Sequence, residues 1–337
     1  MKTALKVIIP LIITGLLIWY MSTIIDPAKV IINLKNADYT WVAITIAISL
    51  LAHLSRAYRW NLLMEPMGYK PPLGKTFMAV MIGYFGNIFI PRMGEVLRCM
   101  VLNWVDRVPF KSSFGTVVAE RVFDFICLLT LIGISLLMEF DRFSTLIKKI
   151  FVVDEKVTEK VANNYVFIIV MVILLVAIVV LFILRKRIIN SPLYGKGKEF
   201  LLGLWQGIIS IKTMKRKWAF LLHTFIIWGC YYFMTYLIFF SLPATANLSP
   251  LAGLVILIVG GLGMSAPASG GIGPFHLMVA GALQLFYGLT KDDGVAYAFV
   301  IHTSQLMTIS VVGLISLVIC LFVARKFKAN SKETQAV

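Results

Sequence analysis

Arginine and glutamate side chains interrupt an otherwise apolar stretch at residues 83–99, GYFGNIFIPRMGEVLRC. An ionisable group inside a bilayer costs about 2.5 to 3.5 kcal/mol even on the mildest insertion scale, so such groups pair or face a polar cavity. Glu95 and Arg98 are three residues apart, which places them on one helix face and predicts that they pair. Arg92 is then available, with Asn87, to bind a phosphate or a carboxylate. The alternative is that Arg92 snorkels to a membrane surface.

A second group of charges lies within residues 113–129, SFGTVVAERVFDFICLL. Glu120 and Asp124 share a helix face at i, i+4, and Arg121 can reach Asp124 at i, i+3. These side chains either form a self-contained structural ion network, or they provide a cation path or charges that balance the arginines of residues 83–99.

Two further arginines, Arg56 and Arg59, lie near the predicted cytoplasmic end of an apolar span at residues 41–64. Their neighbours Tyr58 and Trp60 favour a role as interfacial anchors. The alternative is that they guide anionic headgroups from the inner leaflet.

A glycine-rich segment, GMSAPASGGIGPFH at residues 263–276, could contact phosphate oxygens through the backbone N–H groups of Gly270 and Gly271. His276 ends this segment. His302 and Gln305 are three residues apart in the last apolar span and could point inward with it. Histidines in such places are otherwise hydrogen-bonded structural residues.

The motifs of hydrolases, metalloenzymes and ATPases do not occur in this sequence. There is no HExxH pair, GxSxG elbow or Walker A loop. The four cysteines are far apart and lie in apolar segments, so they form neither a CxxC metal motif nor a disulfide framework. We therefore expect no catalytic residue, no metal and no cofactor.

The composition indicates a polytopic membrane protein. Hydrophobic residues make up 59% of the 337 residues and mean hydropathy is +0.88, whereas soluble domains are roughly half apolar. Six stretches reach the length needed to cross a bilayer, namely residues 5–24, 41–64, 113–138, 164–184, 218–241 and 294–323. The net charge of +16 lies mostly in loops and termini, which indicates anionic lipid and not nucleic acid as the partner.

The distribution of basic residues predicts the orientation. The basic loop at residues 185–217, which contains a helix suited to the membrane interface, should be cytoplasmic. The loop at 140–163 has nearly balanced charge and should face the other side. Both termini are basic and should be cytoplasmic, with a disordered tail at 326–337. We expect one transmembrane domain, residues 1–325, with candidate halves at 41–139 and 218–323.

Two remaining apolar segments, residues 76–105 and 250–289, are broken in the middle by glycine and proline. The charge rule holds if each is a re-entrant helical hairpin. The first would turn near Pro91 to Gly94, where Gly83, Gly86, Pro91 and Gly94 let the helix break, and the second would turn near Pro267 to Gly273. Opposed hairpins suit an inverted repeat with a midplane substrate site. The alternative is two ordinary kinked spans.

Three motifs, GYFGNIFIPRMGEVLR at 83–98, AERVFD at 119–124 and APASGGIGPFH at 266–276, resemble the transmembrane region of the lysylphosphatidylglycerol synthase family, also called the flippase-like or UPF0104 family. The resemblance implies a bacterial or archaeal inner-membrane protein, related to the lipid-translocating half of the multiple peptide resistance factor. The aminoacyl transferase domain of that protein has no counterpart here, so we do not expect lipid synthesis. Family members often carry glutamate where this chain has His276, and that change favours an anionic headgroup.

We therefore predict a translocase for a phospholipid or a polyisoprenyl-linked lipid. The alternatives are an intramembrane enzyme, with Glu120 or Asp124 as base, and a non-catalytic partner of a lipid-modifying enzyme or a glycosyltransferase; a homo-oligomer is a further expectation. The predicted substrate-binding residues are Asn87, Arg92, Glu95, Arg98, Glu120, Arg121, Asp124, Gly270, Gly271, His276, His302 and Gln305.

Overall fold

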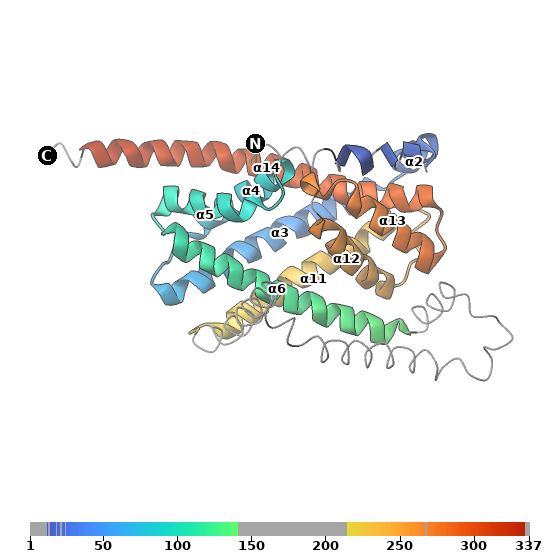
Figure 1. Cartoon of the computed structure of the whole chain (residues 1–337), viewed down its shortest axis with the longest axis horizontal. Coiled ribbons are helices and arrows are strands. Elements are labelled where there is room, and N and C mark those ends of the chain that lie inside the picture. The colour runs from blue at the N-terminus through green and yellow to red at the C-terminus, as the bar shows by residue number, and fades with distance from the viewer. Residues whose placement is uncertain are drawn as a thin grey trace, which may run out of the picture. The chain divides into compact units, whose positions relative to one another are not determined.

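Figure 1 shows the computed structural model of the chain, which describes residues 12–140 and 214–333 apart from five single positions, with side chains as far as residue 323. Every element in these ranges is helical, which confirms the predicted all-helical class. The chain divides into one compact unit, Met1–Ile132 with Thr213–Val337, and a second unit, Gly133–Lys212. The predicted interfacial helix lies outside the described residues except at its very end.

Four helical segments are long and apolar enough to cross a membrane: Tyr39–Met67, Phe110–Met138, Lys217–Ser241 and Lys291–Val323. They comprise α3 (Tyr39–Met64) with η1 (Glu65–Met67), α6 (Phe110–Met138), α11 (Lys217–Leu237) with η2 (Ile238–Ser241), and α14 (Lys291–Glu333). These segments coincide with four of the six predicted spans. The other two, at residues 5–24 and 164–184, lie partly and wholly outside the described residues.

The last helix continues beyond the predicted transmembrane domain. The backbone of α14 is helical as far as Glu333, whereas the sequence predicted a disordered tail from residue 326. The segment ARKFKANSKE at residues 324–333 contains several good helix formers, so the helix can extend past the apolar span.

Side-chain caps explain where several helices begin. The Asp38 carboxylate accepts a hydrogen bond of 2.9 Å from the Thr40 N–H at the start of α3. The Asp26 carboxylate accepts one of 3.0 Å from the Ala28 N–H at the start of the short helix α2 (Pro27–Lys35). Both bonds satisfy a backbone donor that has no partner within the helix.

The first broken segment forms a helical hairpin. α4 (Leu73–Phe89) and α5 (Met93–Asp106) pack side by side and are joined by a short turn. Ile90 is extended, Pro91 cannot continue the helix, and Arg92 has a φ of +64°. A left-handed backbone is uncommon for arginine, so surrounding contacts hold this turn.

The sequence predicted that the glycines of this hairpin let the helix break. In the structure they lie within α4 and α5 and instead bring the two helices together. A Cβ on Gly83 would lie 2.8 Å from the Gly94 carbonyl oxygen, and a Cβ on Gly94 would lie 2.3 Å from the Gly83 oxygen. A Cβ on Gly86 would meet the Leu97 side chain. Asn87 secures the contact, since its Oδ1 accepts a 2.6 Å hydrogen bond from the Gly94 N–H.

The second broken segment is also a hairpin, made of α12 (Pro250–Ser265) and α13 (Pro274–Tyr287), with η3 (Ser269–Gly271) in the connection. Pro267 itself is outside the described residues. Gly270, Gly271 and Gly273 all have positive φ, a conformation that glycine adopts without steric cost. Both hairpins are thus confirmed as helical hairpins, and their re-entrant course through the bilayer stays a prediction.

The tips of the two hairpins meet. η3 packs on α4, and a Cβ on Gly270 would lie 3.7 Å from the Ile88 Cα. α14 packs against α4 as well. Gly313 on α14 leaves room for Phe85 on α4, since a Cβ added to Gly313 would lie 2.6 Å from the Phe85 Cβ. Two broken segments that are far apart in the sequence therefore share one region of the unit.

Apolar packing is concentrated in two places. One core surrounds Phe239 and Tyr297, where α12, α13 and α14 meet η2. The other surrounds Trp60 and Leu102, where α3, α4 and α5 meet. The second core supports the backbone segments that carry the charged residues.

Candidate functional site

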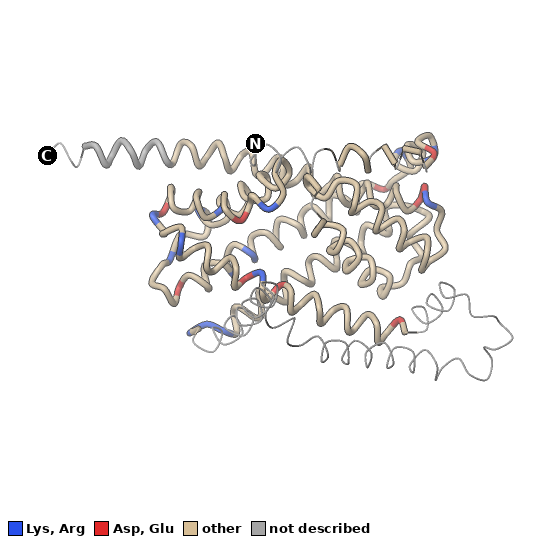
Figure 2. Tube along the Cα trace, in the orientation of Figure 1, with Lys and Arg blue, Asp and Glu red and all other residues tan. Residues whose placement is uncertain are grey.

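Five charged side chains from three helices form a buried cluster. Figure 2 shows charged residues on α3, α5 and α6, while the trace of α12 carries none. Arg56 and Arg59 come from α3, Arg98 from α5, and Glu120 and Asp124 from α6. The three arginines and Glu120 are buried, with Glu120 and Arg59 at 0% exposure. Such a group costs much to desolvate unless every charge has a partner.

The two carboxylates of α6 each hold both arginines of α3. Asp124 accepts from Arg56 Nη1 at 3.0 Å and from Arg59 Nη2 at 2.7 Å. Glu120 accepts from Arg59 Nη2 at 3.2 Å and also from Arg56 Nη1. The remaining Glu120 oxygen lies 3.0 Å from Arg98 Nη2. Glu120 is therefore the central anion of the cluster, because it contacts all three arginines.

Neutral side chains complete the environment of the arginines. Arg56 donates to the Tyr231 hydroxyl at 3.1 Å, and Arg59 donates to the Thr224 hydroxyl at 3.2 Å, both on α11. The Arg98 guanidinium carbon lies 4.7 Å from the centre of the Trp60 ring, a cation–π distance.

An outer ion pair adjoins the cluster. Arg121 Nη2 donates to Glu95 Oε1 at 2.9 Å, and Arg121 Nη1 lies 4.0 Å from an Asp124 oxygen. This pair is more accessible than the cluster, since the side chains of Arg121 and Glu95 are 45% and 22% exposed. It joins α5 of the first hairpin to α6.

The charges of the cluster and the outer pair do not balance. Within the described residues they contain four guanidinium groups and three carboxylates, which leaves one positive charge. Hydrogen bonding is incomplete as well, because the Nε donors of Arg56, Arg59 and Arg98 and the Glu95 Oε2 acceptor are buried without a hydrogen-bond partner. In a buried setting, unpaired donors and an excess of positive charge favour an additional anionic ligand, whereas the unpaired Glu95 oxygen opposes one.

A small pocket opens beside these groups. Its lining combines the helix contact of the first hairpin with the outer ion pair, and consists of Val80, Gly83, Tyr84, Asn87, Gly94, Glu95, Arg98 and Arg121. Its volume is about 10 Å³, room for about one water molecule, so an anion would reach Arg98 and Arg121 only if the lining moves. Of the predicted site residues, Asn87, Glu95, Arg98, Glu120, Arg121 and Asp124 are thus brought together.

Arg92 is placed differently. It lies exposed in the turn of the first hairpin and, in the ranges that the structure describes, has no ion-pair partner. It does not line the pocket at Arg98 and Arg121. Its predicted role as an anion ligand stays a prediction, located at the hairpin tip.

The predicted pairing of Glu95 with Arg98 is wrong. Glu95 pairs with Arg121 and Arg98 pairs with Glu120. Spacing along a helix shows which residues share a face, but α6 approaches α5 closely enough to supply a partner to each. Asp124 does lie near Arg121, as predicted, at 4.0 Å.

The favoured reading of Arg56 and Arg59 as interfacial anchors is also wrong. Both are buried and both bind the carboxylates of α6. The sequence contained a signal for this. Arg56 and Arg59 lie inside an apolar helix, eight and five residues before its end at Met64, so they are not at the helix end where an interfacial anchor would lie. Tyr84, Tyr231 and Thr224 carried no charge and were not predicted to be part of the site.

The remaining predicted residues lie in two other places. His302 on α14 contacts the Gly270 carbonyl oxygen through Nε2 at 2.9 Å, and its ring centre is 4.9 Å from that of His276. His276 on α13 and His302 on α14 therefore lie beside the connection of the second hairpin, which contains Gly271. Gln305 faces a separate niche between α3 and α14.

The fold and the cluster define an integral, multi-pass membrane protein that carries a charged site among its membrane helices. Comparison with known sequences gives the family: the chain belongs to the lysylphosphatidylglycerol synthase TM region family, whose sequence model matches residues 7–313. This confirms the resemblance carried by the three motifs.

Similar proteins include three from archaea. Glycosyltransferase AglD of Haloferax volcanii is 32% identical over 37% of this chain and 20% of its own length. A UPF0104 membrane protein of Methanocaldococcus jannaschii is 31% identical over 35% of this chain and 36% of its own length. One from Methanothermobacter thermautotrophicus is 26% identical over 36% and 38%. The matches thus span less than two fifths of these relatives. No solved structure matches the chain.

Proposed function

We propose that this protein moves a lipid with an anionic headgroup across the membrane, with the cluster and the outer ion pair as the headgroup site. The observation that carries the proposal is the excess positive charge of these groups beside a pocket. The lipid is a phospholipid or a polyisoprenyl-linked lipid, whose chains stay in the bilayer while the headgroup passes the site.

The outer pair supplies the entry step. Arg121 donates a hydrogen bond to Glu95, and a phosphate in the pocket would compete with Glu95 for the same guanidinium. Arg98, which has unused donors, would then take a second phosphate oxygen. Guanidinium groups suit this role because they donate two parallel hydrogen bonds to a phosphate.

The orientation and the location belong to the same proposal. Both termini would be in the cytoplasm of a bacterial or archaeal cell, and the two hairpins would enter the inner membrane from opposite sides. Their tips meet at Ile88 and Gly270, which supports a substrate path where broken helices converge.

The proposal is tested with Arg121→Gln in proteoliposomes that contain a fluorescent phosphatidylglycerol. The rate at which the label becomes accessible to a reductant outside should fall roughly tenfold or more, because a charge-assisted hydrogen bond contributes about 1.5 to 3 kcal/mol. Arg216→Gln is the matched control, since Arg216 is 50% exposed and pairs with Glu65 away from the cluster. Equal rates in both variants and the wild type would refute the assignment of Arg121.

A second candidate is a role beside an enzyme that acts on a lipid-linked substrate. The name of the relative, glycosyltransferase AglD, favours this candidate. The partner would be an enzyme that acts on a lipid-linked substrate, or a second copy of this chain. Co-purification of such an enzyme with this chain distinguishes the partner role from autonomous translocation. Mass spectrometry of the lipids distinguishes translocation from catalysis by this chain. Translocation leaves the lipid mass unchanged, whereas a chemical change that requires Glu120 or Asp124 would favour an intramembrane enzyme.

A further inference from the structure

An apolar groove runs between α3 and α14, away from the charged cluster. Its volume is about 640 Å³, within the range of roughly 300 to 1,000 Å³ that is typical of ligand pockets. Val42, Ile46 and Leu50 line it on α3, and Met307 and Val311 line it on α14. Both helices are long and apolar enough to cross a membrane, so the groove opens toward lipid.

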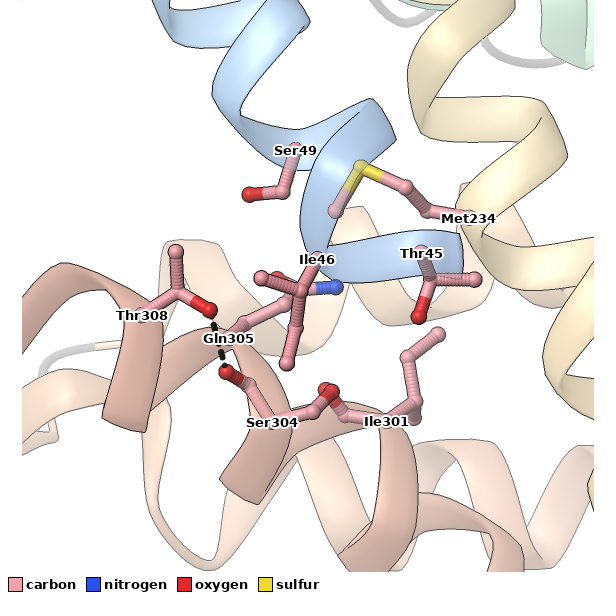
Figure 3. Close-up of a pocket in the computed structure, with 8 residues that line it drawn as sticks. All are labelled: Thr45, Ile46, Ser49, Met234, Ile301, Ser304, Gln305 and Thr308. Carbon is pink, nitrogen blue, oxygen red and sulfur yellow. Dashed lines mark hydrogen bonds between the residues drawn. The ribbon is translucent and has the colours of Figure 1, made fainter. Parts of the chain in front are cut away.

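A narrow polar niche adjoins the groove. Ile46, Ser304 and Thr308 line both, whereas Thr45 and Gln305 line only the niche. Figure 3 shows these side chains gathered where α3 and α14 meet, with the Thr308 hydroxyl bonded within α14. Because the two spaces share a wall, a ligand chain in the groove can place its polar end at the mouth of the niche.

The free hydrogen-bond donors and acceptors of the niche determine which polar group of a ligand can bind there. The hydroxyls of Thr45, Ser304 and Thr308 donate to backbone carbonyls of their own helices, at 2.9, 2.8 and 2.8 Å, so their oxygens are left as acceptors. In the described parts of the chain, the Gln305 amide makes no hydrogen bond, and it offers both donors and an acceptor. Among the described residues, none that lines the niche or the groove is charged. A neutral hydroxyl fits this lining, and a phosphate does not.

The lining also distinguishes a lipid from a second copy of the chain. Helices that associate within a membrane do so through small residues such as glycine and alanine, which let backbones approach. The described lining of the groove has neither; its small residues are Thr303, Ser304 and Thr308, while Met307 and Val311 on the same α14 wall are 63% and 57% exposed. Long, flexible and branched side chains of this kind suit an acyl chain.

We propose that the groove between α3 and α14 binds an uncharged, hydroxyl-bearing lipid of the diacylglycerol class, with an acyl chain in the groove and the hydroxyl at Ser304, Thr308 and Gln305. This site shares no lining residue with the pocket at Arg98 and Arg121. Its occupancy therefore does not depend on lipid translocation at the charged cluster.

The test uses the full chain in nanodiscs with a photoreactive diacylglycerol, and the labelled peptides are identified by mass spectrometry. Labels should fall on α3 and α14 and should be competed by unlabelled diacylglycerol. Met307→Trp, which fills the groove from its exposed side, should abolish labelling. Leu314→Trp is the matched control, because Leu314 is 52% exposed on the same helix and does not line the groove.

A second variant tests the hydroxyl. Gln305→Leu should reduce the preference for diacylglycerol over its O-acetylated analogue by roughly two- to tenfold, as expected for one neutral hydrogen bond. Four results would overturn the proposal. Labelling could survive Met307→Trp or fall on other helices, phosphatidic acid could compete equally well, or a crosslinked dimer could form in place of labelled protein. Since binding is measured and not transport, none of these outcomes depends on Arg121.

Discussion

Glu120 is the residue on which the cluster depends. It is fully buried and faces Arg56, Arg59 and Arg98. The sequence identified Glu120 as important because a carboxylate deep in an apolar helix needs a partner. It did not identify the partners, since those come from α3 and α5 and depend on how the helices pack.

Neutralising this carboxylate should destabilise the protein strongly. Glu120→Gln leaves three buried guanidinium groups with one fewer anion, and breaking a buried pair in this way costs about 3 to 5 kcal/mol. Thermal unfolding in detergent measures the loss. Glu65→Gln removes a partner of Arg216 at the surface, where both side chains are partly exposed, and should cost less than about 1 kcal/mol. Equal shifts in the two variants would contradict the central place of Glu120.

The first hairpin is the element that positions Glu95 and Arg98. Proline at position 91 and the surrounding glycines predicted that the apolar segment is broken, and the structure has the break there. The function of the glycines could not be predicted, because the contact between Gly83 and Gly94 exists only once α4 and α5 are packed.

A single methyl group should separate these helices. In Gly94→Ala, the new Cβ would lie 2.3 Å from the Gly83 oxygen and 2.7 Å from the Asn87 amide nitrogen. Overpacking of this kind costs typically about 1 to 3 kcal/mol, which a lower midpoint of thermal unfolding would report. Gly115→Ala on α6 is the control, since a Cβ there meets nothing within 4 Å. A Gly94→Ala variant as stable as Gly115→Ala would show that the two helices separate without cost.

At the scale of the whole molecule, the central expectation is that the first hairpin enters and leaves on one side. Basic residues flank it, with Lys70 before α4 and Lys111 after α5, and the positive-inside rule favours the same side for both. Composition and charge predicted this course because it follows from length and loop charge alone. The meeting of the two hairpin tips involves contacts between distant segments, which no local pattern encodes.

Cysteine labelling tests this topology. In a variant without the four native cysteines, Lys70→Cys and Lys111→Cys should both react with a membrane-impermeant maleimide applied to the cytoplasmic side. Reaction of the two positions from opposite sides would establish α4 and α5 as a complete span and would invert the helices that follow.

The proposed function requires an anionic headgroup to pass a buried, positively charged site. The most direct measurement is the rate at which the purified wild-type protein exposes labelled phosphatidylglycerol in proteoliposomes, compared with labelled phosphatidylcholine and with protein-free liposomes. We predict faster exposure of the anionic lipid than of the zwitterionic one, and a loss of that difference in Arg121→Gln. Rates for both lipids equal to those of protein-free liposomes would contradict the proposed function.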